Sequence, residues 1–210
     1  GATNIGKTTI AMNIAFANCD MAQDKIVAFF NLEIDENEIY ERALQMEFDL
    51  YTYEVENAFK YKEAETLKRF ETIHHKYMNF VSVIGRVDID DIIPYIKAIE
   101  ESYHKEVGFV IIDHIGLVRN SKYTDEYARI TDCAMKVKEM ALHLRKPFLD
   151  LSQTSRADVK NNDKGLTMYA GKGSGEIENS SQIVITMDKL TPDKALSENV
   201  SQHLIDLAND

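Results

Sequence analysis

The stretch that decides the fold is residues 1–8, Gly1-Ala2-Thr3-Asn4-Ile5-Gly6-Lys7-Thr8, which matches the pattern GxxxxGK[ST] of a phosphate-binding P-loop. Gly1 and Gly6 leave room for backbone N–H groups to turn inward and form a concave nest for a phosphate. The loop then opens a helix, and the helix dipole also favours an anion at that end. The pattern therefore predicts that residues 1–8, together with the adjacent Thr9, bind a nucleoside triphosphate.

Two side chains of the loop have predicted chemical roles. Lys7 can reach the β- and γ-phosphates, and the Thr8 hydroxyl is suited to ligate Mg²⁺. Apolar residues follow at helical spacing, which is the context that a P-loop requires: Ile10, Ala11, Ile14 and Ala15. The alternative is a Gly-rich turn that matches the pattern by chance. The strand that normally feeds such a loop would precede residue 1, so we expect the sequence to be a fragment of a longer protein.

Composition excludes several classes of protein. A chain of 210 residues with 44% hydrophobic content can bury one substantial core, which favours a single α/β domain. No apolar run approaches the ~18 residues of a membrane-spanning helix, and no signal peptide is visible, so we expect a cytoplasmic protein without a membrane partner. Cys19 and Cys133 lack a metal-ligand spacing and are predicted to be reduced core residues. The net charge of −11 argues against a generally basic surface, although local basic loops remain compatible with it.

Apolar runs alternate with amphipathic stretches along the rest of the chain. We predict strands at residues 25–30, 80–84, 109–113, 146–153 and 182–187, and helical segments at 35–48, 55–77, 88–103 and 127–144. Strands separated by helices of this length imply right-handed βαβ crossovers. The predicted fold class is therefore α/β, with a mostly parallel twisted sheet flanked by helices.

Polar residues fall at the ends of three predicted strands, where parallel sheets bind their ligands. Asp113 follows an apolar run directly, as does a Walker B aspartate that holds the Mg²⁺ shell. Glu33 lies just beyond an earlier strand, where a carboxylate could orient or deprotonate an attacking water. Gln153 could hydrogen-bond the γ-phosphate or that water. On position alone, Asp113 could be an ordinary strand-ending residue, Glu33 a solvated loop acid, and Gln153 a residue that satisfies loop backbone.

Four further motifs occur in a fixed order after the P-loop: Asn31-Leu32-Glu33, Ile111-Ile112-Asp113-His114, Leu151-Ser152-Gln153-Thr154-Ser155-Arg156 and Gly173-Ser174-Gly175-Glu176-Ile177-Glu178-Asn179. This order resembles the RecA-like motor domain of DnaB-type replicative helicases and phage primase-helicases. The resemblance covers roughly residues 1–189 and implies a RecA-like P-loop NTPase core that lacks its first strand. Residues 190–210 would then be a C-terminal loop and a truncated strand.

The resemblance also implies roles for single residues and for partners. Lys7, Glu33 and Gln153 would act in catalysis, with Glu33 as the base and Gln153 as the γ-phosphate sensor, while Thr8 and Asp113 would hold the metal. ATP or another NTP, with Mg²⁺, would drive translocation on single-stranded DNA and duplex unwinding. The family implies a hexameric ring, and a primase or a helicase loader is a further candidate partner.

In that family, loops after the Walker B strand and after the Gln-bearing strand contact DNA. The corresponding regions here are residues 119–123 and 156–172, and their basic residues are Arg119, Lys122, Arg156, Lys160, Lys164 and Lys172. Glycines in the second region suit backbone contacts to phosphate. The alternative is a solvated loop with incidental lysines.

The sequence departs from the family at its end, because no arginine suited to act as an arginine finger precedes Asp210. Such a finger contributes ~10³–10⁵ in rate, so we expect the isolated fragment to be a weak ATPase. A RecA/KaiC-like recombination or regulatory ATPase is one alternative function, and a loader or interaction domain that binds nucleotide without hydrolysis is another. The aromatic residues between Tyr51 and Phe70 are interpreted as helix packing or a subunit contact rather than base stacking.

Overall fold

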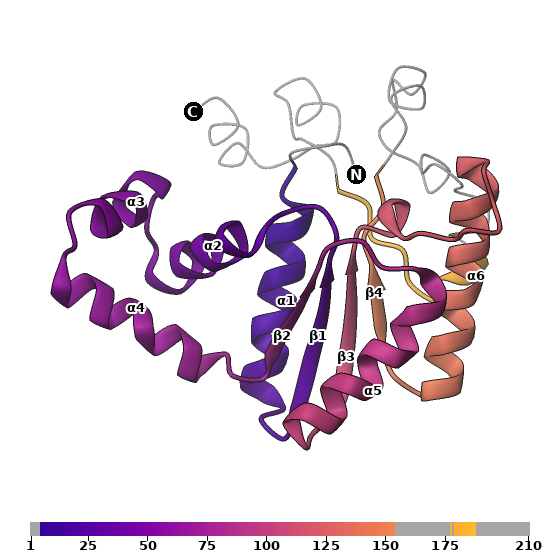
Figure 1. Ribbon diagram of the computed structural model, residues 1–210, viewed down its shortest axis with the longest axis horizontal. Coiled ribbons are helices and arrows are strands. Elements are labelled where there is room, and N and C mark those ends of the chain that lie inside the picture. The colour runs from indigo at the N-terminus through magenta and orange to yellow at the C-terminus, as the bar shows by residue number, and fades with distance from the viewer. Residues whose placement is uncertain (1–4, 154–176, 178, 188–210) are drawn as a thin grey trace, which may run out of the picture.

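Parallel strands form the centre of the computed structural model, which describes residues 5–153, 177 and 179–187 (Figure 1). The strands are β1 (Lys25–Asn31), β2 (Phe80–Ile84), β3 (Glu106–Asp113) and β4 (Phe148–Asp150). They lie in the order β2-β1-β3-β4, and each neighbouring pair is parallel. The predicted α/β class with a parallel sheet is confirmed.

Helices flank this sheet along both sides (Figure 1). They are α1 (Lys7–Met21), α2 (Glu36–Phe48), α3 (Thr52–Lys60), α4 (Ala64–Lys76), α5 (Ile92–Tyr103) and α6 (Glu126–Leu144), with short 3₁₀ turns η1 (Ile89–Asp91) and η2 (Ile115–Leu117). The predicted helical segment 55–77 is thus two helices, separated near Lys62, whose φ of 54° is left-handed. Among the described residues, no helix has the length and apolar composition to cross a membrane.

Side chains that alternate along β1 divide the interior into two cores. Ile26, Ala28 and Phe30 face one core, which α5 and α6 complete, and Cys133 belongs to it. Val27 and Phe29 face the other core, which α1 to α4 complete, and Cys19 belongs to that one. Both faces of a parallel sheet are covered in this way, which explains the continuous apolar runs in the strand sequences. Both cysteines are buried and free, as predicted.

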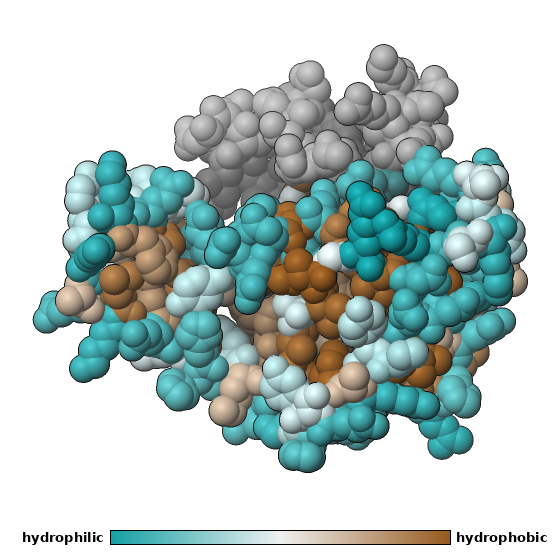
Figure 2. All heavy atoms as spheres, in the orientation of Figure 1, coloured by the Kyte–Doolittle hydropathy of each residue, from teal (hydrophilic) through white to brown (hydrophobic). Residues whose placement is uncertain are grey.

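Aspartate side chains cap the starts of two helical segments. Asp35 accepts a hydrogen bond from the Glu38 backbone N–H at 2.9 Å and caps α2. Asp88 accepts one from the Asp90 N–H at 3.1 Å and caps η1, just before α5. The carboxylate of Asp90 instead pairs with Lys136. On the face shown in Figure 2, hydrophobic residues gather over β2 and α5, and hydrophilic residues surround them.

The predicted strand at residues 182–187 is wrong, because these residues form no strand in the structure. Their apolar side chains are exposed instead, with 81% of Ile183 and 75% of Ile185 accessible to solvent. The physical reason is the lack of a partner strand among the described residues. The described sheet ends at β4, which spans three residues and pairs with β3, and no other described strand lies beside it.

Candidate nucleotide-binding site

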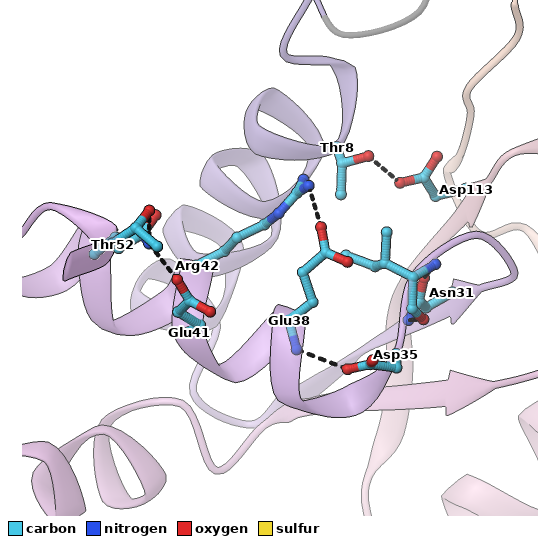
Figure 3. Close-up of polar contacts among 10 residues, drawn as sticks. Thr8, Asn31, Asp35, Glu38, Glu41, Arg42, Thr52 and Asp113 are labelled. Carbon is cyan, nitrogen blue, oxygen red and sulfur yellow. Dashed lines mark hydrogen bonds and ion pairs between the residues drawn. The ribbon is translucent and has the colours of Figure 1, made fainter. Parts of the chain in front are cut away.

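The carboxyl end of β3 meets the start of α1, although the two are far apart in the sequence. Thr8 Oγ1 donates a hydrogen bond of 2.6 Å to Asp113 Oδ2 (Figure 3). Asp113 is fully buried, and its second oxygen, Oδ1, has no hydrogen-bond partner in the described part of the chain. A hydroxyl and a buried carboxylate with an unsatisfied oxygen are suitable ligands for Mg²⁺ or for its bound water. The two predicted metal ligands are therefore adjacent.

Electrostatics at this point favour a cation. Burial raises the pKa of Asp113, although the hydrogen bond from Thr8 opposes that shift. Burial likewise lowers the pKa of Lys7, while the carboxylates of Glu33 and Asp113 oppose that change. The lysine and the two acids thus interact, so the structure brings together three of the residues that the sequence singled out. A bound divalent ion would relieve the cost of the buried carboxylate.

The P-loop itself is described only at its C-terminal end. Gly6 has a φ of 83°, a left-handed conformation that glycine adopts readily, and it precedes α1 as its N-cap. The Ile10 N–H bonds to the Gly6 carbonyl at 2.9 Å and begins the helical ladder. Ile5 is half-buried and Thr9 is exposed. Gly1, Ala2, Thr3 and Asn4 lie outside the described residues.

Asn31 holds the turn that carries Glu33. Its side chain is fully buried at the end of β1, where Oδ1 accepts from the Ile34 N–H at 3.1 Å and Nδ2 donates to the Ile34 carbonyl. The Leu32 N–H also bonds to the Asp113 carbonyl at 2.9 Å, which ties the turn to β3. These bonds leave the Glu33 side chain exposed at the sheet edge. Asn31 belongs to one of the four motifs, but its role in holding the turn was not predicted, although a polar residue that ends an apolar strand is a usable signal.

The other predicted residues fall into two groups. Gln153 is half-buried beyond the end of β4. It lies two residues after Leu151, whose N–H bonds to the Ile112 carbonyl of β3 at 3.0 Å. Arg119 and Lys122 are exposed in the connection between η2 and α6, at the same edge of the sheet. The remaining predicted DNA contacts lie outside the described residues: Arg156, Lys160, Lys164 and Lys172.

Comparisons with known proteins agree with this arrangement. The family model described as "DnaB-like helicase C terminal domain" matches residues 1–205. The replicative DNA helicase DnaB of Helicobacter pylori strain J99 is 29% identical over 87% of this chain, and the match spans 37% of that protein. A probable plasmid replicative DNA helicase of Chlamydia psittaci is 24% identical over 88% of this chain and 40% of its own length. The chain thus spans about two fifths of these relatives.

Solved structures give the same fold. A structure described as a DnaB-like replicative helicase and its interactions with primase superimposes with a TM-score of 0.73 at 21% identity, over 86% of this chain and 43% of that one. A KaiC-like protein from Pyrococcus horikoshii reaches a TM-score of 0.52 at 14% identity, over 87% of this chain and 67% of that one. The expected RecA-like fold is confirmed, and the likeness is greater to the DnaB-like structure. On the family match over residues 1–205, this chain belongs to the DnaB-like helicase C-terminal domain family.

Proposed function

We propose that this domain is the ATP-hydrolysing motor of a replicative DNA helicase, which couples hydrolysis to translocation on single-stranded DNA and duplex unwinding. The observation that carries the proposal is the meeting of Thr8 and Asp113 beside Glu33 and Lys7. A hydroxyl, a buried carboxylate, a lysine and an exposed acid are the groups that phosphoryl transfer requires. The names of the matched relatives, replicative DNA helicases, support this choice among P-loop functions.

The proposed chemistry assigns one task to each residue. Lys7 binds the β- and γ-phosphates of ATP, and Thr8 and Asp113 hold Mg²⁺, which neutralises charge on the phosphate oxygens when it is bound. Glu33 projects from the turn that Asn31 fixes, and it accepts a proton from the water that attacks the γ-phosphorus. Gln153, at the end of β4, hydrogen-bonds the γ-phosphate and passes its loss to the residues that follow.

The proposed partners are single-stranded DNA and further copies of the chain in a hexameric ring. A ring would let a neighbouring subunit supply an arginine finger, which is worth ~10³–10⁵ in rate. Primase is a further candidate, since the DnaB-like structural relative is described together with its interactions with primase.

Glu33→Gln in the full-length protein tests the central assignment. We expect ATP turnover and unwinding of a forked duplex to fall by about 10²–10⁴, because the amide cannot accept the proton of the attacking water. Binding of a fluorescent ATP analogue should persist, since Glu33 is not assigned to the phosphates. Glu36→Gln is the matched control, because Glu36 is the next exposed glutamate along the chain and lies in the first turn of α2. Unchanged turnover in Glu33→Gln would contradict the proposal.

A further inference from the structure

A cavity of about 840 Å³ opens beside Glu33, at the carboxyl ends of β1, β2 and β3. Residues from several connections line it, including Glu33, Arg86, His114, Arg119 and Arg129. Arg86 follows β2 and is not among the site residues predicted from the sequence. In Figure 2 the most strongly hydrophilic group on the face shown lies over the connection between β2 and α5.

Backbone pairing places Arg86 and Arg119 on the same side. Asp88 and Arg119 form an isolated parallel bridge, in which the Arg119 N–H bonds to the Val87 carbonyl and the Ile89 N–H to the Arg119 carbonyl, both at 2.9 Å. Side chains alternate between the two sides of such extended segments, so the side chains of residues 86 and 88 lie on the same side as that of residue 119. Their neighbours point the other way and are buried: Val87, Ile89, Val118 and Asn120. The bridge therefore turns both arginines toward the cavity.

The walls of the cavity are held by hydrogen bonds. Arg129, from α6, donates to the Gly116 carbonyl at 2.9 Å and also to the Val118 carbonyl. Asn120 Nδ2 donates to Asp132 Oδ2 at 2.6 Å, which fixes the connection just after Arg119 to α6. The ring of His114 packs against Gly116, where an added Cβ would lie 2.9 Å from two of its ring atoms. The arginines thus extend from a pre-formed backbone, which reduces the entropic cost of binding a ligand.

The charge of the cavity favours an anion. Three arginines and two carboxylates, Glu33 and Asp88, line it, on a chain whose net charge is −11. Asp88 already accepts the hydrogen bond that caps η1. Within the described ranges, the side chains of Arg86 and Arg119 make no ion pair or hydrogen bond, and both are exposed. A guanidinium group presents a planar fork of N–H donors that matches a phosphate, so two arginines on one edge of a cavity favour a phosphate group as the ligand.

We propose that Arg86 and Arg119 together bind one backbone phosphate of single-stranded DNA in this cavity, which makes Arg86 a DNA contact outside the two predicted loops. The inference rests on the proposed helicase function. Because Glu33 lines the same cavity, a phosphate bound there would lie near the Glu33 carboxylate and repel it. DNA would then act directly on the predicted catalytic base.

The test is the salt dependence of DNA binding by the full-length protein. Affinity for labelled oligo(dT) is measured over a NaCl series, with a non-hydrolysable ATP analogue, for the parent, Arg86→Gln, Arg119→Gln and the double variant. Because both arginines are proposed to bind one phosphate, each single substitution should reduce the magnitude of the slope of log K against log [NaCl] by up to about 0.7. The double variant should lose no more than about 0.7. Arg86→Lys should recover part of the slope, since it restores the charge.

Lys68→Gln, an equal charge change at an exposed position in α4, should keep the parent slope and affinity. An Arg86→Gln slope equal to the parent slope overturns the inference, whereas a parent that does not bind oligo(dT) at all overturns the proposed function as well. Inorganic phosphate is the competing ligand. If Arg86→Gln altered inhibition of turnover by free phosphate and left the oligo(dT) slope intact, the cavity would be a product site and the inference would fail.

Discussion

Two apolar runs of similar composition have opposite fates in this molecule. Val110-Ile111-Ile112 lies in the second half of β3 and is completely buried. Ile183-Val184-Ile185 is exposed and forms no strand. The β-branched composition is the same, so local propensity does not explain the difference. The difference lies in the partners, because β3 lies between β1 and β4, whereas no described strand lies beside residues 183–185.

Alanine substitutions in the two runs should give the largest contrast. Ile111→Ala removes a side chain that is fully buried in the core formed with α1 to α4, so we expect a loss of about 2–5 kcal/mol in the free energy of unfolding. Ile185→Ala removes an exposed side chain and should change that free energy by less than about 0.5 kcal/mol. Denaturant unfolding of the 210-residue chain measures both. Equal losses would show that residues 183–185 are packed in solution.

A further contrast involves β4, where the described sheet ends. Burial raises the pKa of Asp150 to about 7, and its Oδ1 has no partner among the described residues. Asp150 therefore loses its proton at a lower pH in the unfolded chain than in the folded one. The free energy of unfolding should then fall as pH rises from about 4 to about 7, by at most about 1.4 kcal/mol per pH unit. Asp150→Asn should abolish that decline, as measured by urea unfolding at several pH values.

Asp90→Asn is a control, because Asp90 should change the free energy of unfolding with pH in the opposite direction to Asp150. The hydrogen bond from Lys136 lowers the pKa of Asp90, so the contribution of that carboxylate is present at neutral pH and is lost as pH falls below about 4. A decline between pH 4 and 7 that persists in Asp150→Asn would contradict the assignment to Asp150.

Sequence patterns predicted most of the central elements. Apolar runs predict the end of β1 to within one residue and the end of β3 at Asp113, although β3 begins at Glu106, before the predicted start at residue 109. The P-loop pattern predicts α1 behind it. The meeting of Thr8 with Asp113 then follows from the rule that parallel strands present their ends at one edge. The roles assigned to Glu33 and Gln153 stay predictions.

Contacts between two irregular segments could not be predicted in this way. The bridge between Asp88 and Arg119 joins two connections with no periodicity, so nothing in the sequence pairs Arg86 with Arg119. The turn held by Asn31 depends on a side chain that bonds to backbone three residues later. The wrong strand prediction at residues 182–187 has a different cause. A strand pattern does not show whether a neighbouring strand is present to pair with it.

The two buried thiols allow each side of the sheet to be followed separately. Burial raises the pKa of Cys19 to about 12 and that of Cys133 to about 11, so almost no thiolate, the reactive form, exists at neutral pH. A thiol reagent would therefore label either residue only after its own layer opens. Because Cys19 belongs to the core with α1 and Cys133 to the core with α6, single-cysteine variants would time the opening of the two layers without any added probe.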